Sequence, residues 1–199
     1  MYNIVTIERR YASGGNEIGK KLADALGYKL YDRNILIKAA KNLEIPYFQI
    51  EDLDESASGG ILMNLAKTGL GGLSGNRELP LADKLFLEEE RIIEEAANKG
   101  DCVIVGRASG YILRERENAL RVFVYADKQK RIKRAIEREG IQQSEAENAL
   151  KRNDKRRGGF YNTVTNWEWG APEYYDLYMN AGTLGIDTCV RILAEAVKG

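Results

Sequence analysis

The residues from Arg9 to Glu17 have types and spacing that suit the binding of an anion. The stretch reads RRYASGGNE and follows an apolar run, residues 2–7. A glycine pair at a helix start permits a tight turn and directs backbone N–H groups, with the positive helix end, toward a ligand. Standing alone, Ser-Gly-Gly more often simply begins a helix. Its place after the first predicted strand favours a phosphate-binding loop. The candidate phosphate ligands are Arg9, Arg10, Ser13, Gly14, Gly15, Asn16 and Glu17.

Two registers align this region with the P-loop pattern G-x-x-x-x-G-K-[ST]. One register uses Gly19 and Lys20, but these fall within the predicted amphipathic helix, and Lys21 stands where Ser or Thr is required. The other register begins directly after the strand. It puts Gly15 at the position of the P-loop lysine, with no hydroxyl residue directly after it, and Glu17 is taken to stand for the magnesium-binding Ser or Thr, so the loop is degenerate.

Because the P-loop lysine is missing, another residue would have to supply its positive charge. Arg9 and Arg10 stand at the carboxyl end of the predicted first strand, so either one is a candidate. A site that has lost catalysis explains the same sequence equally well. The ligands of a magnesium ion also stay open, with Glu17, Asp32 and Asp154 as candidates.

A second group of cations lies in KRNDKRR, residues 151–157. Guanidinium groups bind phosphate oxygens bidentately, and Arg152, Arg156 and Arg157 therefore suit a lid that closes on a transferring phosphoryl group. Gly158 and Gly159 predict a hinge beside it. The simpler alternative is a solvated helix face. The chain has no histidine, which excludes the usual serine or cysteine triads and leaves an inventory suited to phosphoryl transfer.

The elements that must position these residues alternate between strand and helix. Apolar runs at residues 3–7, 28–32, 102–106, 121–126 and 175–180 are separated by helical patterns. This alternation predicts an α/β fold with a parallel sheet covered on both faces. We expect one domain, residues 1–199, with its core in 1–33, 81–127 and 174–199. A glycine-rich insert is expected at about 34–80, and a lid with its arms at about 128–173.

Composition limits the partners. Thirty basic residues balance thirty acidic ones, so the sequence predicts neither a nucleic-acid nor a membrane partner. No signal peptide is recognisable, and Cys102 and Cys189 have the pattern of core residues in a reducing compartment, which together predict a cytoplasmic location. The aromatic segment 160–176 is expected to pack against the sheet. It and the insert are also the surfaces on which a homodimer is conceivable.

Several motifs follow one another in an order that resembles the cytidylate kinase-like family, relatives of bacterial CMP kinase. They are ERRYASGGNEIGKKLADALGYKLYD, CVIVGRASGYIL, RVFVYADKQKRIKRAIEREG, RNDKRR and YDLYMNAGTLGID. The resemblance covers nearly the whole chain. It implies a P-loop NTPase-type three-layer fold with a five-stranded parallel sheet, a nucleoside monophosphate (NMP)-binding insert and an arginine-bearing lid.

The resemblance also implies roles for individual residues. Asp32, with Arg33 beside it, matches the segment near the monophosphate site, and Arg107 matches an arginine that binds the acceptor nucleotide. Ala108 replaces the acid that follows that arginine in CMP kinases, which puts cytosine recognition in question. In the lid, the matching positions are Arg152, Asp154 and Arg157, with Arg156 between the last two.

The expected activity is therefore transfer of the ATP γ-phosphate, with Mg²⁺, to a nucleoside monophosphate such as CMP. Arg107, Arg152 and Arg157 are the expected catalytic cations. Two alternatives remain: a nucleotide-binding or regulatory protein with impaired catalysis, and a kinase for another small acceptor.

Overall fold

Five parallel strands form the centre of the molecule in the computed structural model, which describes residues 1–46 and 79–199. Their order across the sheet is β2-β3-β1-β4-β5. The strands are β1 (Ile4–Arg9), β2 (Lys29–Tyr31), β3 (Cys102–Val105), β4 (Ala119–Tyr125) and β5 (Leu177–Asn180). The predicted parallel α/β sheet is thus confirmed.

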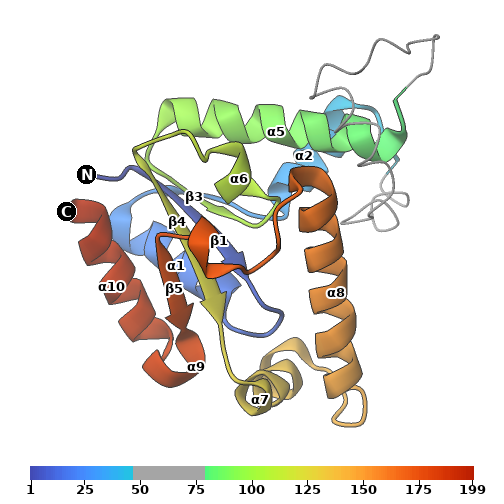
Figure 1. Ribbon diagram of the computed structural model, residues 1–199, viewed down its shortest axis with the longest axis vertical. Helices are drawn as coiled ribbons and strands as arrows, with labels where there is room; N and C mark the ends of the chain where they lie inside the picture. The colour runs from blue at the N-terminus through green and yellow to red at the C-terminus, as the bar shows by residue number, and fades with distance from the viewer. Residues whose placement is uncertain (47–78) are drawn as a thin grey trace.

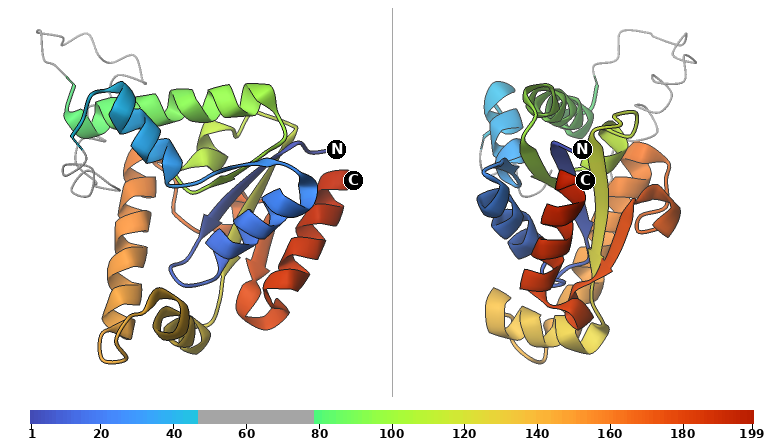
Figure 2. Two further views of the ribbon diagram at one scale, coloured as in Figure 1. Left: turned by 180° about the vertical axis from the view of Figure 1, so that it is seen from behind. Right: turned by 90° about the vertical axis from the view of Figure 1, so that its left-hand side faces the viewer.

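Helices cover both faces of this sheet (Figures 1 and 2). The helices are α1 (Gly15–Leu26), α2 (Asn34–Asn42), α5 (Leu81–Lys99), α6 (Ser109–Ile112), α7 (Lys128–Glu139), α8 (Ala146–Thr165), α9 (Ala181–Leu184) and α10 (Ile186–Lys198), with a 3-10 turn at Pro172–Tyr174. None of the helices within the described ranges is long and apolar enough to cross a bilayer.

The sheet has two cores because side chains alternate along each strand. On one face, Val5 and Ile7 of β1 pack with α1 and α10, whose Leu22 and Leu193 are fully buried. On the other face, Ile104 belongs to a core shared with α2, α5 and the end of α8. Strands buried on both faces explain the nearly continuous apolar runs in the sequence.

The aromatic segment packs as expected. Phe123 of β4 lies against Trp169, with ring centroids 5.6 Å apart, and against Tyr175, at 5.0 Å. Trp167 stacks on Tyr174 at 4.2 Å. This segment therefore closes the core over β4.

Two sequence expectations differ from the structure or fall outside it. The predicted hinge at Gly158–Gly159 is absent, because α8 continues through both glycines as far as Thr165. Packing of Phe160 and Tyr161 in the core holds the second half of this helix in place. The expected insert, about 34–80, forms α2 at its start, and its glycine-rich part lies outside the described residues.

Candidate active site at the carboxyl ends of the strands

The segment from Arg9 to Glu17 connects β1 to α1 and lines a pocket of about 80 Å³, here called the phosphate-loop pocket. Gly14 precedes α1 with φ 93°, and Ala12 has φ 55°, so the chain bends sharply twice within the loop. The Ser13 hydroxyl donates to the carbonyl of Val124 at 3.1 Å, which fixes the loop to the end of β4. The buried backbone of this loop presents the N-terminus of α1 to the pocket, the arrangement that binds anions.

Asp154 of α8 holds this loop from the other side. Its carboxylate accepts the Tyr11 N–H at 2.8 Å and a hydrogen bond from Arg131 of α7 at 2.7 Å. Arg131 also donates to the Tyr11 carbonyl at 2.7 Å, and Arg10 lies 3.6 Å from Asp154. The structure therefore shows Asp154 in contact with the loop backbone, where it positions the loop.

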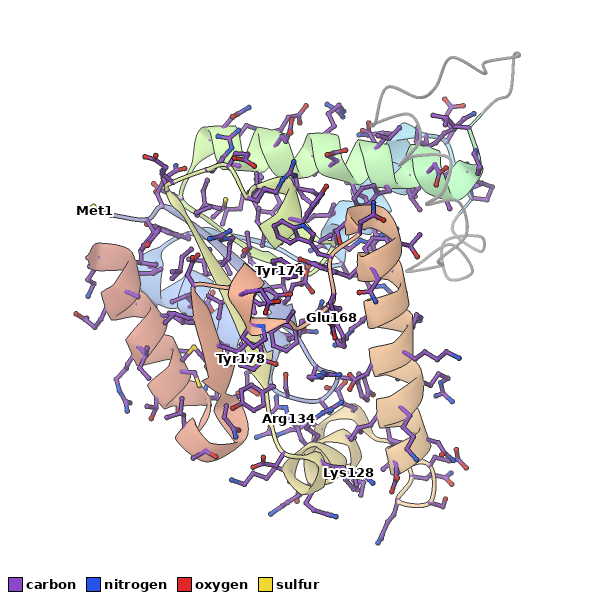
Figure 3. All side chains as sticks on the ribbon, viewed as in Figure 1. Met1, Lys128, Arg134, Glu168, Tyr174 and Tyr178 are labelled. Atoms are coloured by element: carbon purple, nitrogen blue, oxygen red, sulfur yellow. The ribbon has the colours of Figure 1, made fainter. Side chains whose placement is uncertain are left out.

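Arg134 of α7 faces the same pocket, as Figure 3 shows. It donates to the Glu17 carboxylate at 2.6 Å, and Lys21 lies 3.5 Å from the same group. The hydrogen bond from Arg134 is the main cause that lowers the pKa of Glu17 below its usual value. Arg131 and Arg134 were missed in the sequence, because a helix reading KQKRIKRAIERE resembles a solvated basic helix.

A second pocket, of about 210 Å³, adjoins the first and is here called the arginine pocket. Its positively charged side chains come from elements that are far apart in the chain. Its lining consists of Arg9, Asn16, Asp32, Arg33, Leu36, Val105, Arg107, Arg156 and Arg157. Five guanidinium groups therefore surround a space with a single carboxylate, which predicts a strongly anionic ligand.

Arg107 enters this pocket from the turn after β3, where its φ of 59° is in the left-handed region. Glu89 of α5 forms an ion pair with it, and both side chains are almost fully buried, at 7% and 0% exposed. The ring of Phe160 lies 4.9 Å from the guanidinium carbon. Glu89 was missed in the sequence, although it stands on the buried face of α5, four residues after Leu85, which is a detectable signal.

The predicted site residues are thus largely, but not wholly, brought together. Arg9, Asn16 and Arg157 line both pockets, and Arg157 also donates to the Arg9 carbonyl at 3.3 Å. In the described part of the chain, neither pocket is lined by Arg152 or Asp154. Arg152 is exposed on α8.

Three residues with side-chain oxygens line one further depression, together with Lys20, Leu30 and Val105. Asn16, Glu17 and Asp32 line it beside the phosphate loop. Residues 1–46 and 79–199 contain no cluster of three or more acidic or cysteine ligands. Kinases usually hold Mg²⁺ by one or two carboxylates together with phosphates and water.

The matches with known proteins agree with this geometry. The model of the cytidylate kinase-like family matches residues 4–183. The chain belongs to this family. A search of curated proteins finds no match.

Several solved structures are similar to this chain in fold. An uncharacterized protein from Eubacterium ventriosum is 25% identical, with a TM-score of 0.74 and 98% of each chain covered. A shikimate kinase from Bacteroides thetaiotaomicron is 14% identical, with a TM-score of 0.55 and 98% of each chain covered. A shikimate kinase from Acinetobacter baumannii, in complex with shikimate, is also 14% identical, with a TM-score of 0.52 over 100% of this chain and 94% of that one. The family and the fold are those of P-loop kinases.

Proposed function

We propose that this protein transfers the γ-phosphoryl group of ATP to a nucleoside monophosphate such as CMP. The observation that carries the proposal is the junction of two cationic pockets at Arg9, Asn16 and Arg157. Phosphoryl transfer needs a donor and an acceptor held in line, with positive charge around the group that moves. Two adjoining anion pockets provide that arrangement.

The phosphate-loop pocket is assigned to ATP. Residues 14–16 form the N-terminus of α1, where backbone N–H groups and the helix dipole favour negative charge. Arg10 is close to the loop but is engaged with Asp154 at 3.6 Å and with the Trp169 ring at 4.8 Å. Its contribution is therefore to hold the loop rather than to reach a phosphate.

The arginine pocket is assigned to the acceptor. Arg33, Arg107 and Arg156 supply planar donors for a phosphomonoester dianion, and Asp32 on the same wall is placed to accept a hydroxyl or amino hydrogen bond. Arg157, which lines both pockets, is assigned to the transferring group. Arg152 stands one turn before Arg156 on the continuous helix α8, is exposed and lines neither pocket, so it is given no role in the transfer.

The chemical step needs no covalent intermediate with the protein. An oxygen of the acceptor phosphate forms a bond to the γ-phosphorus, the bond to the β–γ bridging oxygen breaks, and that oxygen leaves on ADP with the electron pair. The arginines orient both anions and neutralise charge at the bridging and equatorial oxygens. Asn16, Glu17 and Asp32 are the residues that would hold Mg²⁺, which neutralises phosphate charge when bound.

A different acceptor is the second candidate, on one observation. Ala108 stands where CMP kinases carry an acid, and its side chain is 1% exposed, so this position offers no polar contact to a base. The two pockets would serve any small acceptor with a phosphate or carboxylate group.

The test is ADP formation from ATP and Mg²⁺ with CMP, dCMP, UMP, AMP, shikimate or no acceptor. Arg107→Ala is a poor probe because it leaves Glu89 buried without its partner. Arg33→Ala and Arg156→Ala change exposed residues of the arginine pocket. We expect each to raise the acceptor KM by about tenfold, the effect of roughly one charged hydrogen bond. Arg114→Ala, an exposed arginine outside both pockets, is the matched control.

Turnover that depends on CMP and weakens in the two pocket variants supports the proposal. Turnover only with another acceptor selects the second candidate. Binding of ATP without any turnover would mean that the protein is a nucleotide-binding module.

A further inference from the structure

The phosphate loop departs from the P-loop pattern at two positions that touch each other. In the register from Arg9 to Glu17, the first glycine of the pattern falls on Arg9 and its lysine falls on Gly15. An arginine thus stands where glycine is expected, and a glycine where the cation is expected. The sequence alone cannot show whether these two departures are connected.

The structure connects them through space. A Cβ atom placed on Gly15 would lie 2.5 Å from Cβ of Arg9 and 2.8 Å from its Cγ. Real Cβ atoms do not approach so closely, so a lysine at position 15 is incompatible with the present path of the Arg9 side chain. The absence of a side chain at Gly15 is what lets the Arg9 stem pass over the N-terminus of α1.

A second glycine accommodates the other end of Arg9. Gly106 follows β3 with φ 80°, and a Cβ there would overlap Nη1 of Arg9 and stand 3.1 Å from its Cζ. The Nε group donates to Oδ1 of Asn16 at 2.8 Å, which fixes the plane of the guanidinium. The side chain therefore runs from the phosphate loop to the end of β3 and lines both pockets.

The two other cations that the sequence offers for the missing lysine, Arg10 and Lys20, are placed differently. Arg10 lines the phosphate-loop pocket only, and it lies 3.6 Å from Asp154 and 4.8 Å from the Trp169 ring. Lys20 is exposed on α1 and pairs with Asp24 at 2.9 Å. Among these three side chains, only Arg9 lines the two pockets together.

We infer that Arg9 and Gly15 are an exchanged pair: the cation that a standard P-loop supplies from its lysine position is supplied here from the position of its first glycine. Arg9 binds the terminal phosphates of a nucleoside triphosphate where the two pockets meet. The inference rests on the proposed function for the identity of the ligand. A guanidinium suits the role because it stays charged at any working pH and presents two parallel donors to phosphate.

The first experiment is calorimetric titration with ATP and, separately, with inorganic tripolyphosphate, which lacks base and ribose. Arg9→Ala is expected to weaken binding of both by about 10- to 100-fold, the range for a lost charged hydrogen-bonding group. Arg191→Ala, an exposed arginine on α10, is the matched control and is expected to bind as the wild type does. Arg9→Gln, which removes the charge but keeps a polar side chain, is the second variant if Arg9→Ala fails to fold.

The second experiment tests the exchange itself. Gly15→Lys alone should lower the melting temperature, because its Cβ collides with the Arg9 stem. The double variant Arg9→Gly, Gly15→Lys should recover both the melting temperature and tripolyphosphate affinity to within about tenfold of the wild type, since lysine binds phosphate as a point charge. A double variant no better than Arg9→Gly alone would overturn the inference.

The outcomes separate this inference from the proposed function. Lost tripolyphosphate binding in Arg9→Ala, with no turnover in the wild type, supports the inference and rejects the kinase. Turnover in the wild type, with unchanged tripolyphosphate binding in Arg9→Ala, supports the kinase and rejects the inference. A wild-type protein that binds neither ATP nor tripolyphosphate rejects both.

Discussion

The phosphate-loop pocket and the arginine pocket meet at Arg9, Asn16 and Arg157 but are built in opposite ways. The first is lined mainly by nine consecutive residues, 9–17, and its shape follows the path of the backbone. The second is lined by side chains from α2, β3, α8 and the segments that precede or follow them. The first pocket takes its shape mainly from one segment of backbone, whereas the second exists only when distant elements are correctly packed.

The two pockets nevertheless have one structural feature in common. Each is positioned by a carboxylate from a helix that is distant in sequence: Asp154 of α8 holds the loop, and Glu89 of α5 holds Arg107. The arginines give each pocket its positive charge, and the carboxylates of Asp154 and Glu89 fix the groups that they contact in position. The comparison therefore predicts that removing an acid damages a pocket as much as removing an arginine does.

Glu89→Gln should have the largest effect. It removes the countercharge of an arginine that is 7% exposed, and breaking a buried pair is expected to lower the free energy of unfolding by about 3 kcal/mol. Urea unfolding followed by circular dichroism measures this. Glu94→Gln, exposed on the same helix, should change stability by less than about 0.5 kcal/mol. Equal effects of the two variants would show that Glu89 does not hold Arg107.

Asp154→Asn should have an intermediate effect. The amide oxygen can still accept the Tyr11 N–H, but the charge opposite Arg131 and Arg10 is lost. We expect a loss of about 2 kcal/mol in unfolding free energy and weaker ATP binding, with a smaller change in acceptor binding. Asp24→Asn, which breaks an exposed pair on α1, is the control. An acceptor affinity that falls more than ATP affinity would contradict the division of labour between the pockets.

Glu17→Gln should have the smallest effect on stability, and we expect this effect to appear in the pH dependence of unfolding. Because the hydrogen bond from Arg134 lowers the folded-state pKa of Glu17, its contribution is present above the unfolded pKa and is lost as pH falls through the folded value. The side chain is 32% exposed, so solvent limits the contribution to about 0.5 kcal/mol.

The measurement for Glu17→Gln compares urea unfolding at pH 6, 4 and 3. The wild type should lose more stability than the variant over this range. Other carboxylates with lowered pKa values, such as Glu88 and Asp187, titrate in both proteins and cancel in the difference. Identical pH slopes would contradict the link between Arg134 and Glu17.

The sequence predicted the local parts of this molecule best. The alternation of apolar runs and helical periods indicated the parallel sheet, which the structure contains. The loop between Arg9 and Glu17 was recognisable because its residues are contiguous. The sequence did not distinguish Arg9 from Arg10 as the residue that replaces the P-loop lysine, because the direction of a side chain depends on what packs around it.

The sequence predicted tertiary partners poorly. Arg131, Arg134 and Glu89 lie in charged helices, and only their three-dimensional neighbours distinguish them from solvated residues. Gly158 and Gly159 suggested a hinge by their local propensity, yet the packing of Phe160 and Tyr161 keeps α8 continuous. Packing thus outweighed intrinsic preference at this point.

The continuity of α8 has a mechanical consequence. This one rod contacts the loop backbone twice, through Asp154 at the Tyr11 N–H and through Arg157 at the Arg9 carbonyl, and it also carries Arg156. A slip of one helical turn, about 5.4 Å, would break both contacts and withdraw the cation in the same movement. Because α8 contacts the loop of one pocket and lines the other, we expect a ligand bound in either pocket to change the affinity of the other.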